Sequence, residues 1–348
     1  MLFQYLRMGN WFKYKATLAG ILILLFSLLS LRKEKEISIS SNAWGFFGHK
    51  RINRIAVFTL PPEMFGFYKE HLEYITEHAV DPDKRRYAVK GEAECHFIDI
   101  DHYAIGGQNP FEVVPRSWTK AVEKFSEDTL HAYGIVPWHI QIMKMKLQRA
   151  FENKNIDLIL KYSADIGHYI GDSHVPLHTT ENYNGQMTGQ KGIHGLWESR
   201  LVEINAEDYD YFVGKSSYIK KPLDFTWNAV QHSHYALDSV LRFEKELTQK
   251  FPEDKKYSYE QRGNVTVQTY SLEFSQAYHK MLNGMVERRL RQAILAVGSF
   301  WYTAWVDAGQ PDLTKLQHVP PSAELIKEIQ ELDAMYQAGE VKGRDCDH

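Results

Sequence analysis

The chain has 348 residues, of which 44% are hydrophobic and 13% aromatic, and its formal net charge is −3. This composition is that of a globular protein of one large or two ordinary domains, with enough apolar residues for a sizeable core. The near-neutral charge excludes a global field that captures nucleic acid, so a polyanionic substrate would have to be attracted by metals or by a local basic patch.

Residues 1–43 have the features of a targeting segment. Basic residues precede an apolar run at 16–31, and the segment ends in small residues at Ala43. We expect a signal peptide that is cleaved after Ala43, which makes Trp44 the mature N-terminus of an exported, periplasmic or secreted protein. The alternative is an uncleaved membrane anchor, because the charged stretch 32–36 is an unusually long polar interval before the cleavage site.

The mature N-terminus combines a free amine with an early histidine. Glycines punctuate the start, and Ile52 and Ile55 then recur at helical spacing. His49 is therefore expected at the beginning of a helix. Together with the amine of Trp44 it could bind a metal, and the alternative is an ordinary helix entry.

Between residues 70 and 102 the chain mixes carboxylates and histidines at high density, including Asp81, Asp83 and His96. Oxygen and nitrogen donors of this kind are typical of metal sites without cysteine. Asp81 and Asp83 compete for the same role, and spacing alone does not separate them. The alternative interpretation is a solvated, charged loop.

Cysteine is too scarce to serve as a metal ligand or scaffold. Cys95 and Cys346 are the only two, whereas the chain has 16 histidines. A disulfide between the two cysteines would close a very long loop, and the sequence leaves open whether they approach. Any metal must therefore rest on His, Asp and Glu.

Two core helices are predicted at 137–151 and 156–173, from apolar residues at helical spacing. The second helix carries His168 and Asp172. Their four-residue separation puts both side chains on one face of a helix, one above the other. We expect them to serve one metal site.

A proline separates this pair from the next histidine. Pro176 lacks an N–H and its ring collides with the preceding turn, so His178 is expected to leave the helix axis and face a different metal. A loop rich in Gly, Asn and Gln at 179–193 then leads to His194 and Glu198. These two again lie four residues apart, which suits a second ligand pair.

The rest of the chain is predicted to be helical. We expect helices near 229–250 and over 272–307, with an amphipathic helix and a polar tail after them. No repeat, phosphate-binding glycine loop or clear strand series appears. The prediction is an all-α, single-domain multi-helix bundle at 44–315, followed by a C-terminal helix and tail at 316–348.

In chain order the ligand-type residues are Trp44, His49, Asp81, His96, His168, Asp172, His178, His194 and Glu198. This combination, and above all the stretch His-x-x-Gly-Asp-x-His-x-Pro-Leu-His, resembles the superfamily of bacterial zinc-dependent phospholipases C and fungal single-strand-specific nucleases. The resemblance spans about residues 44–198. It implies an all-α enzyme with three zinc ions in a cleft, and an N-terminal tryptophan that binds metal through its amine and carbonyl.

The resemblance also implies how the ligands are divided among the ions. It implies a first zinc on Asp81, His96, His168 and Asp172. It implies a second on Trp44, His49 and Asp172, which would bridge the two ions, and a third on His178, His194 and Glu198.

Clustered divalent charge suits phosphoester hydrolysis. Metal coordination lowers the pKa of water from about 15.7 to about 7, so a hydroxide that bridges two zincs could attack phosphorus in line, while the third ion stabilises an oxygen. Asp81 is expected also to orient the nucleophile, and Arg85 or Lys84 to neutralise developing charge. The alternative for the basic pair is ordinary surface charge.

The spacing of the motifs is shared between two branches of the superfamily that act on different substrates. The ending in His194 and Glu198 looks like the phospholipase branch, whereas the short gap from Trp44 to His49 looks like the nuclease branch. We expect an exported phospholipase C-like phosphodiesterase with possible peripheral membrane contact. The alternatives are a single-strand nuclease or 3′-nucleotidase, acting on nucleic acid or nucleotides, and a non-catalytic zinc-stabilised binding protein. No protein partner is indicated.

Overall fold

The computed structural model of this chain describes residues 45–262 and 265–339. The chain divides into two units, Met1–Ser41 and Asn42–His348. The first unit lies outside the described residues, as do Trp44 and Cys346, and the predicted signal segment, N-terminal metal ligand and disulfide therefore lie outside them too. The account below concerns the described part of the second unit.

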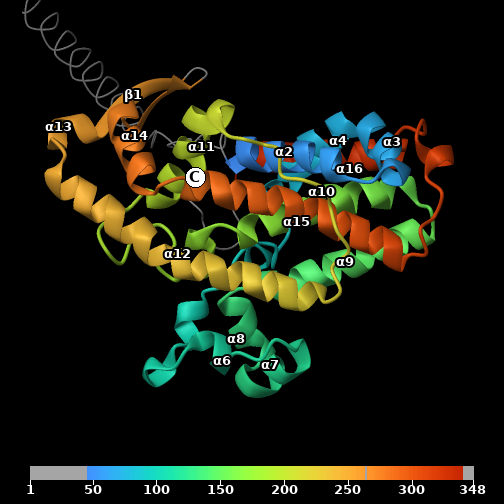
Figure 1. Cartoon of the computed structure of the whole chain (residues 1–348), viewed down its shortest axis with the longest axis horizontal. Coiled ribbons are helices and arrows are strands. Elements are labelled where there is room, and N and C mark those ends of the chain that lie inside the picture. The colour runs from blue at the N-terminus through green and yellow to red at the C-terminus, as the bar shows by residue number, and fades with distance from the viewer. Residues whose placement is uncertain (1–44, 263–264, 340–348) are drawn as a thin grey trace, which may run out of the picture. The chain divides into compact units, whose positions relative to one another are not determined.

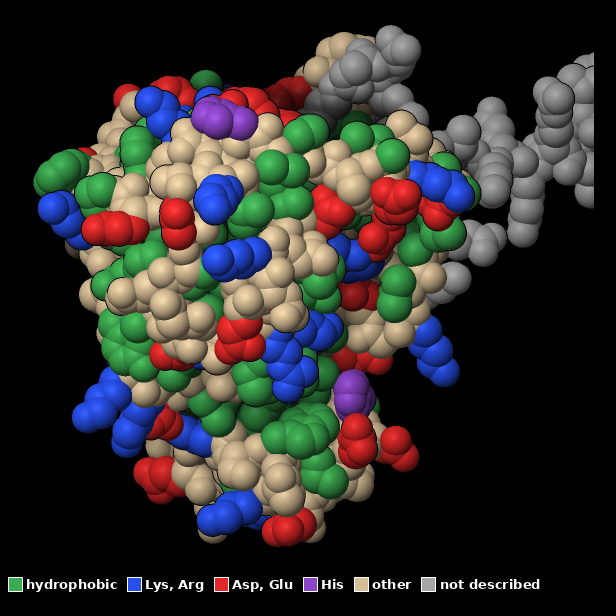
Figure 2. Space-filling model, turned by 90° about the vertical axis from the view of Figure 1, so that its right-hand side faces the viewer, with side chains coloured by type: hydrophobic (Ala, Val, Ile, Leu, Met, Phe, Trp, Pro, Cys, Tyr) green, Lys and Arg blue, Asp and Glu red, His purple; other side chains and the backbone are tan. Residues whose placement is uncertain are grey.

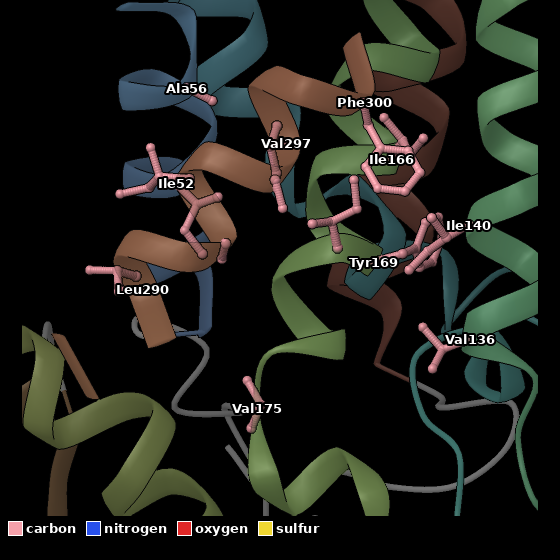
Figure 3. Close-up of a cluster of buried hydrophobic side chains, with 14 of the residues drawn as sticks. Ile52, Ala56, Val136, Ile140, Ile166, Tyr169, Val175, Leu290, Val297 and Phe300 are labelled. Atoms are coloured by element: carbon pink, nitrogen blue, oxygen red, sulfur yellow. The ribbon is translucent and has the colours of Figure 1, made fainter. Parts of the chain in front are cut away.

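Four helices form the centre of the fold. They are α2 (Gly45–Ala56), α9 (Val136–Glu152), α10 (Ile156–Ser173) and α15 (Met285–Asp307). Helix α10 packs against the other three, and Figure 3 shows their apolar side chains meeting around Ile166. Because neighbours cover α10 on several sides, all residues from Ser163 to Ser173 are buried, including its polar ones.

Local signals in the sequence explain the ends of the two central helices that were predicted. Asn155 caps α10 by accepting a hydrogen bond from the backbone N–H of Leu158 at 3.0 Å. Pro137 lies in the first turn of α9, where its missing N–H has no helical partner to lose. Both predicted helices are confirmed, and their boundaries agree within one residue.

Helix α2 lies very close to α10 because α10 has glycine where the two meet. A Cβ atom on Gly167 would fall 1.9 Å from Oδ1 of Asn53. Asn53 itself is buried, and its Nδ2 donates a hydrogen bond to the Ala164 carbonyl at 3.0 Å. The amide therefore joins the two helices at a distance that only glycine permits.

The other helices surround this centre (Figure 1). They are α3 (Pro62–Glu70), α4 (Leu72–Glu77), α5 (Asp81–Arg85), α6 (Pro110–Val113), α7 (Trp118–Phe125), α8 (Glu127–Ala132), α11 (Leu201–Asn205), α12 (Pro222–Lys250), α13 (Glu253–Lys256), α14 (Leu272–Met281) and α16 (Ala323–Ala338). Short 3₁₀ or π-helical turns are η1 (Val57–Thr59), η2 (His78–Val80), η3 (Ala93–Cys95), η4 (Ile100–Tyr103), η5 (Ile105–Gly107), η6 (Pro176–Thr179), η7 (Gly195–Arg200), η8 (Ala206–Asp208) and η9 (Thr314–Leu316).

The single long helix predicted over 272–307 is wrong. The structure divides it into α14 and α15, because Asn283 and Gly284 both adopt positive φ angles, 49° and 72°. Positive φ breaks the right-handed helix, and glycine adopts it without strain. The apolar spacing continues across the break, which explains why periodicity alone did not reveal it.

A two-stranded antiparallel hairpin is the one sheet among the described residues. It pairs β1 (Tyr257–Arg262) with β2 (Val265–Tyr270), with Tyr257 opposite Tyr270. The all-α fold class is confirmed, with this hairpin as an addition that the sequence did not predict. No described helix has the length and apolarity needed to cross a membrane.

Helix α16 corresponds to the predicted C-terminal helix and packs against α5. Lys84 on α5 donates to Asp333 at 2.7 Å. The backbone N–H of Ser322, the residue before α16, donates to Asp157 on α10 at 2.9 Å. The end of the described chain is therefore fixed to the same two helices that carry candidate ligands.

The close approach of α2 and α10 predicts that Gly167→Ala destabilises the fold. The added methyl must displace Asn53, and overpacking of this kind costs about 1–3 kcal/mol in the free energy of unfolding. Denaturant unfolding measures the change. The matched control is Gly66→Ala in α3, where the new Cβ meets only the end of the Gln317 side chain at 2.9 Å. That variant is expected to be neutral or up to ~1 kcal/mol more stable, because alanine favours helix. Equal stability of both variants would contradict the argument.

Candidate metal centre

Helix α10 supplies the central pair of candidate ligands. His168 and Asp172 lie one turn apart with Nε2 of the imidazole 3.4 Å from Oδ2 of the carboxylate. The imidazole is held from behind, because its Nδ1–H donates to the Ala79 carbonyl at 2.9 Å. In the neutral ring this leaves a lone pair on Nε2, directed toward the cluster, as a metal ligand requires.

Helix α2 brings His49 against this pair. Its ring stacks on that of His168, with centroids 3.9 Å apart, and its Nε2 lies 3.2 Å from Oδ1 of Asp172. A Cβ on Gly171 would fall 2.8 Å from Nδ1 of His49, so glycine is needed here as well. The sequence places small residues in α10 where the imidazole of α2 must fit.

His96 approaches from the loop after η3. Its Nδ1 lies 3.1 Å from Oδ2 of Asp172, so the two oxygens of this carboxylate face different histidines. On its other side Nε2 lies 3.7 Å from Glu92, which also pairs with Arg85 at 3.5 Å. Asp172 therefore lies between His49 on one side and His96 on the other.

A second group forms where the chain leaves α10. His178 lies in η6, which begins at Pro176, and its Nδ1–H donates to the His96 carbonyl at 2.9 Å. Its Nε2 lies 3.4 Å from Oε2 of Glu198, and Nε2 of His194 lies 2.7 Å from the same oxygen. His178 leaves the axis of α10, as the sequence predicted, although its Nε2 still lies 4.0 Å from Oδ1 of Asp172.

These side chains form overlapping buried sets whose ligand atoms lie within 4.8 Å of one another. The sets are His96, His168 and Asp172; His49, Asp83 and His168; His49, Asp172 and Glu198; and His178, His194 and Glu198. Glu198 reaches both groups, since its Oε1 is 3.6 Å from Nε2 of His49. The sequence assigned Glu198 to one group only.

Asp83, and not Asp81, lies beside the histidines of these sets. Oδ1 of Asp83 is 3.5 Å from Nε2 of His168 and 3.8 Å from Nδ1 of His96. Asp81 instead accepts from Nδ1 of His78 at 2.8 Å and pairs with Lys84 at 3.0 Å. Residues two apart on a helix point to nearly opposite sides, so the two aspartates cannot share one site.

Arg85, the predicted charge-neutralising residue, also lies away from the ligand sets. Its guanidinium pairs with Asp165 at 3.0 Å and donates to the Tyr169 hydroxyl at 3.2 Å. Arg85 contacts Glu92, which in turn faces His96. Arg85 can therefore help to orient His96, but it does not itself contact the ligand sets. Glu92 itself was missed, although it lies four residues before His96, the same helical spacing that revealed the other pairs.

The electrostatics of the cluster keep its carboxyl groups ionised. Burial alone would raise the pKa values of Asp172 and Glu198, but the surrounding histidines bring both well below their usual range. Burial lowers the pKa of His49, yet its bonds to Asp172 and Glu198 outweigh this and raise it to about 10. A metal that binds here must therefore displace protons from histidine.

The donor set fits divalent metal ions. Nitrogen and oxygen donors converge from helices that hold them rigidly, and cysteine is absent from the described sets. Nε2 of His49 lies 3.2 Å from Asp172 and 3.6 Å from Glu198, so this imidazole directs a nitrogen donor into the space between two buried carboxylates. Three carboxylates brought together in a buried space likewise require cations.

The comparison with known families agrees with this geometry. The family model described as S1/P1 Nuclease matches residues 44–297, well over half of the chain and all of the candidate ligands. No curated protein matches the sequence closely enough to count as a relative. The match falls on the nuclease branch of the superfamily, whereas the expected phospholipase C specificity has no support from it. The chain belongs to the S1/P1 nuclease family, a family of metal-dependent phosphodiester hydrolases.

Proposed function

We propose that this chain is an exported zinc-dependent nuclease that cleaves phosphodiester bonds of single-stranded nucleic acid. The observation that carries the proposal is the convergence of buried imidazoles and carboxylates within the matched family region. Cleavage after Ala43 would release Trp44 as the mature N-terminus, five residues before His49 in the sequence. Its amine would then be available as a further ligand.

The ligands would hold three zinc ions, divided as the side chains group. One ion falls to Asp83, His96, His168 and Asp172; another to Trp44, His49 and Asp172; and another to His178, His194 and Glu198. Zinc there supplies Lewis acidity, which lowers the pKa of water and polarises a phosphoryl oxygen. Asp83 replaces Asp81 in this assignment because of its distances to His168 and His96.

Residues behind the ligands would keep them aimed. The Ala79 carbonyl holds His168, and the His96 carbonyl holds His178, each through an Nδ1–H. Glu92 faces the outer nitrogen of His96, and a carboxylate in this position increases the basicity of a metal-bound imidazole. Arg85 would act through Glu92 as a positioning residue.

Aromatic side chains beside the second ligand group favour nucleic acid over phospholipid. Nδ1 of His234 lies 3.1 Å from the carbonyl oxygen of Thr179. Thr179 directly follows the candidate ligand His178. The centroid of the Phe111 ring lies 5.7 Å from that of His234 and 5.9 Å from that of Tyr235. Tyr235 is 60% exposed. We call Phe111, His234 and Tyr235 the aromatic shelf. Unstacked bases bind such rings whatever their sequence.

Surface charge is consistent with local rather than global attraction of a strand. Acidic and basic side chains are interspersed over the face drawn in Figure 2. With a net charge of −3, the protein has no single-sign field to gather polyanions. The metals and the aromatic shelf would therefore have to supply most of the affinity.

A substrate panel on the zinc-loaded mature protein tests the function. Single-stranded DNA, RNA and 3′-nucleotides are expected to be hydrolysed, whereas phosphatidylcholine is not. Removing zinc with a chelator should abolish turnover, lower the melting temperature, and be reversed by added zinc. Turnover of phosphatidylcholine alone would show a phospholipase. Metal retention without turnover of any substrate would show a non-catalytic binding protein.

The two aspartates of α5 form a matched pair for testing the ligand assignment. Loss of a residue that only supports a metal ligand weakens metal binding by ~10–100-fold. Asp83→Asn removes a proposed ligand itself, so we expect it to weaken zinc binding by more than this, with a parallel fall in kcat/KM. Asp81→Asn should keep the full zinc content, because it removes only the contacts to His78 and Lys84. Metal analysis after dialysis measures both. Zinc loss in the Asp81 variant but not in the Asp83 variant would restore the original assignment.

The aromatic shelf predicts a selective effect on KM. Stacking contributes ~1–3 kcal/mol per base, so Tyr235→Ala is expected to raise KM for single-stranded DNA roughly tenfold or more with little change in kcat. Zinc content should not change. Tyr259→Ala is the control, because Tyr259 in β1 is 73% exposed and outside the shelf. Equal KM values for both variants would remove the shelf from the proposal.

A further inference from the structure

Arg289 on α15 is a buried cation with no described acidic partner. Only 7% of Arg289 is exposed to solvent. The other buried arginines differ, since Arg86 lies 3.8 Å from Asp83 and Arg200 pairs with Glu260. Burial lowers the pKa of Arg289 to about 10, and among residues 45–262 and 265–339 no carboxylate opposes the shift. A desolvated, uncompensated charge of this kind costs folding free energy unless an anion joins it.

Neutral groups hold the guanidinium in place. Nε donates to the His174 carbonyl at 2.8 Å, and Nη2 donates to the Ala229 carbonyl at 3.2 Å and to the hydroxyl of Ser233. Nη1 differs, because its bond at 3.0 Å goes to the exposed side chain of Gln292. An external anion can therefore replace Gln292 on Nη1 without disturbing the bonds to the main chain.

Arg289 and Gln292 line a pocket of about 370 Å³ between α12 and α15, the two long helices that run across Figure 1. No Asp or Glu is among its lining residues. Asn228 and His232 add polar groups from α12, and Phe225 adds an apolar wall. At the rim, Arg116 donates to Asn228 at 3.1 Å while its other nitrogen pairs with Asp224.

We propose that this pocket binds a phosphate-type oxyanion on Arg289, at a site separate from the metal ligands. A guanidinium matches the oxygens of phosphate in geometry as well as charge. The anion would compensate the buried cation, and the wall formed by Phe225 leaves room for an organic group attached to the phosphate. The inference goes beyond the proposed function, because it depends on Arg289 and not on zinc or on the substrate cleaved.

The pocket is distinct from a smaller cavity that also touches Arg289. That cavity, of about 40 Å³, is mostly apolar and reaches His49 and Glu198. Gln292 lines the larger pocket only. Substitution of Gln292 therefore tests the anion site without altering the wall of the metal centre.

Gln292→Glu is the decisive variant. It places a carboxylate at Nη1 of Arg289, so it should keep or raise the melting temperature while it excludes an external anion. Calorimetric titration of inorganic phosphate into the zinc-loaded protein, freed of excess zinc, is expected to find one phosphate fewer per chain, or binding at least ~10-fold weaker, equal to 1.4 kcal/mol. Gln249→Glu, an exposed site on α12, makes the same change of charge and should bind phosphate as the unaltered protein does.

Identical phosphate binding by all three proteins would overturn the inference. Asn228→Asp provides a second reading if the first variant is unstable, because a carboxylate in the pocket should also repel the anion. Preserved affinity in a folded Asn228→Asp variant would likewise count against the site. Since hydrolysis is measured separately, intact nuclease activity with no phosphate difference overturns this inference alone, and the reverse result overturns only the proposed function.

The source of the phosphate group is identified by a second ligand. If a nucleoside 5′-monophosphate binds more tightly than inorganic phosphate, and Gln292→Glu removes the gain, the site takes a nucleotide that uses Phe225. If the nucleotide and inorganic phosphate bind with equal affinity, and Gln292→Glu weakens the binding of both, the site takes free phosphate. Both results support the oxyanion site.

Discussion

The close contact between α2 and α10 is the constraint on which the rest of the structure depends. Gly167 and Gly171 leave no side chain between the two helices, so Asn53 bonds to the α10 backbone and His49 stacks on His168. A larger residue at either glycine would push α2 outward. His49 would then no longer reach Asp172, and the carboxylate would lose the partner that faces its Oδ1.

The cluster works against the stability of the fold that contains it. Asp83, Asp172 and Glu198 are all buried, and a buried carboxylate costs several kcal/mol unless it is paired. Histidines compensate part of that cost in the polypeptide itself, and bound cations would compensate the rest. The apolar contacts among α2, α9, α10 and α15 in Figure 3 supply the stability that lets these groups stay together.

Features that depend on the local periodicity of the sequence could be predicted, whereas features that depend on tertiary contacts could not. Helices α9 and α10 follow from apolar spacing, and α10 ends before Pro176, so that His178 leaves its axis as predicted. Asp81 and Asp83 could not be separated, because α5 is too short to show an apolar stripe that would mark its inner face. Arg289 lies in a charged stretch of the sequence, and the neutral groups that surround it among the described residues come largely from α12, far away in the sequence.

The candidate ligands His168 and His178 are oriented by carbonyl groups of Ala79 and His96, which belong to the main chain. Every amino acid supplies the same carbonyl, so the side chain at position 79 can vary, within the limits of its buried surroundings, while His168 stays aimed. An insertion or deletion near that position has no such tolerance, because it would turn the carbonyl away from the imidazole. The length of this segment therefore matters more than its composition for keeping the His168 ring directed at the candidate metal centre.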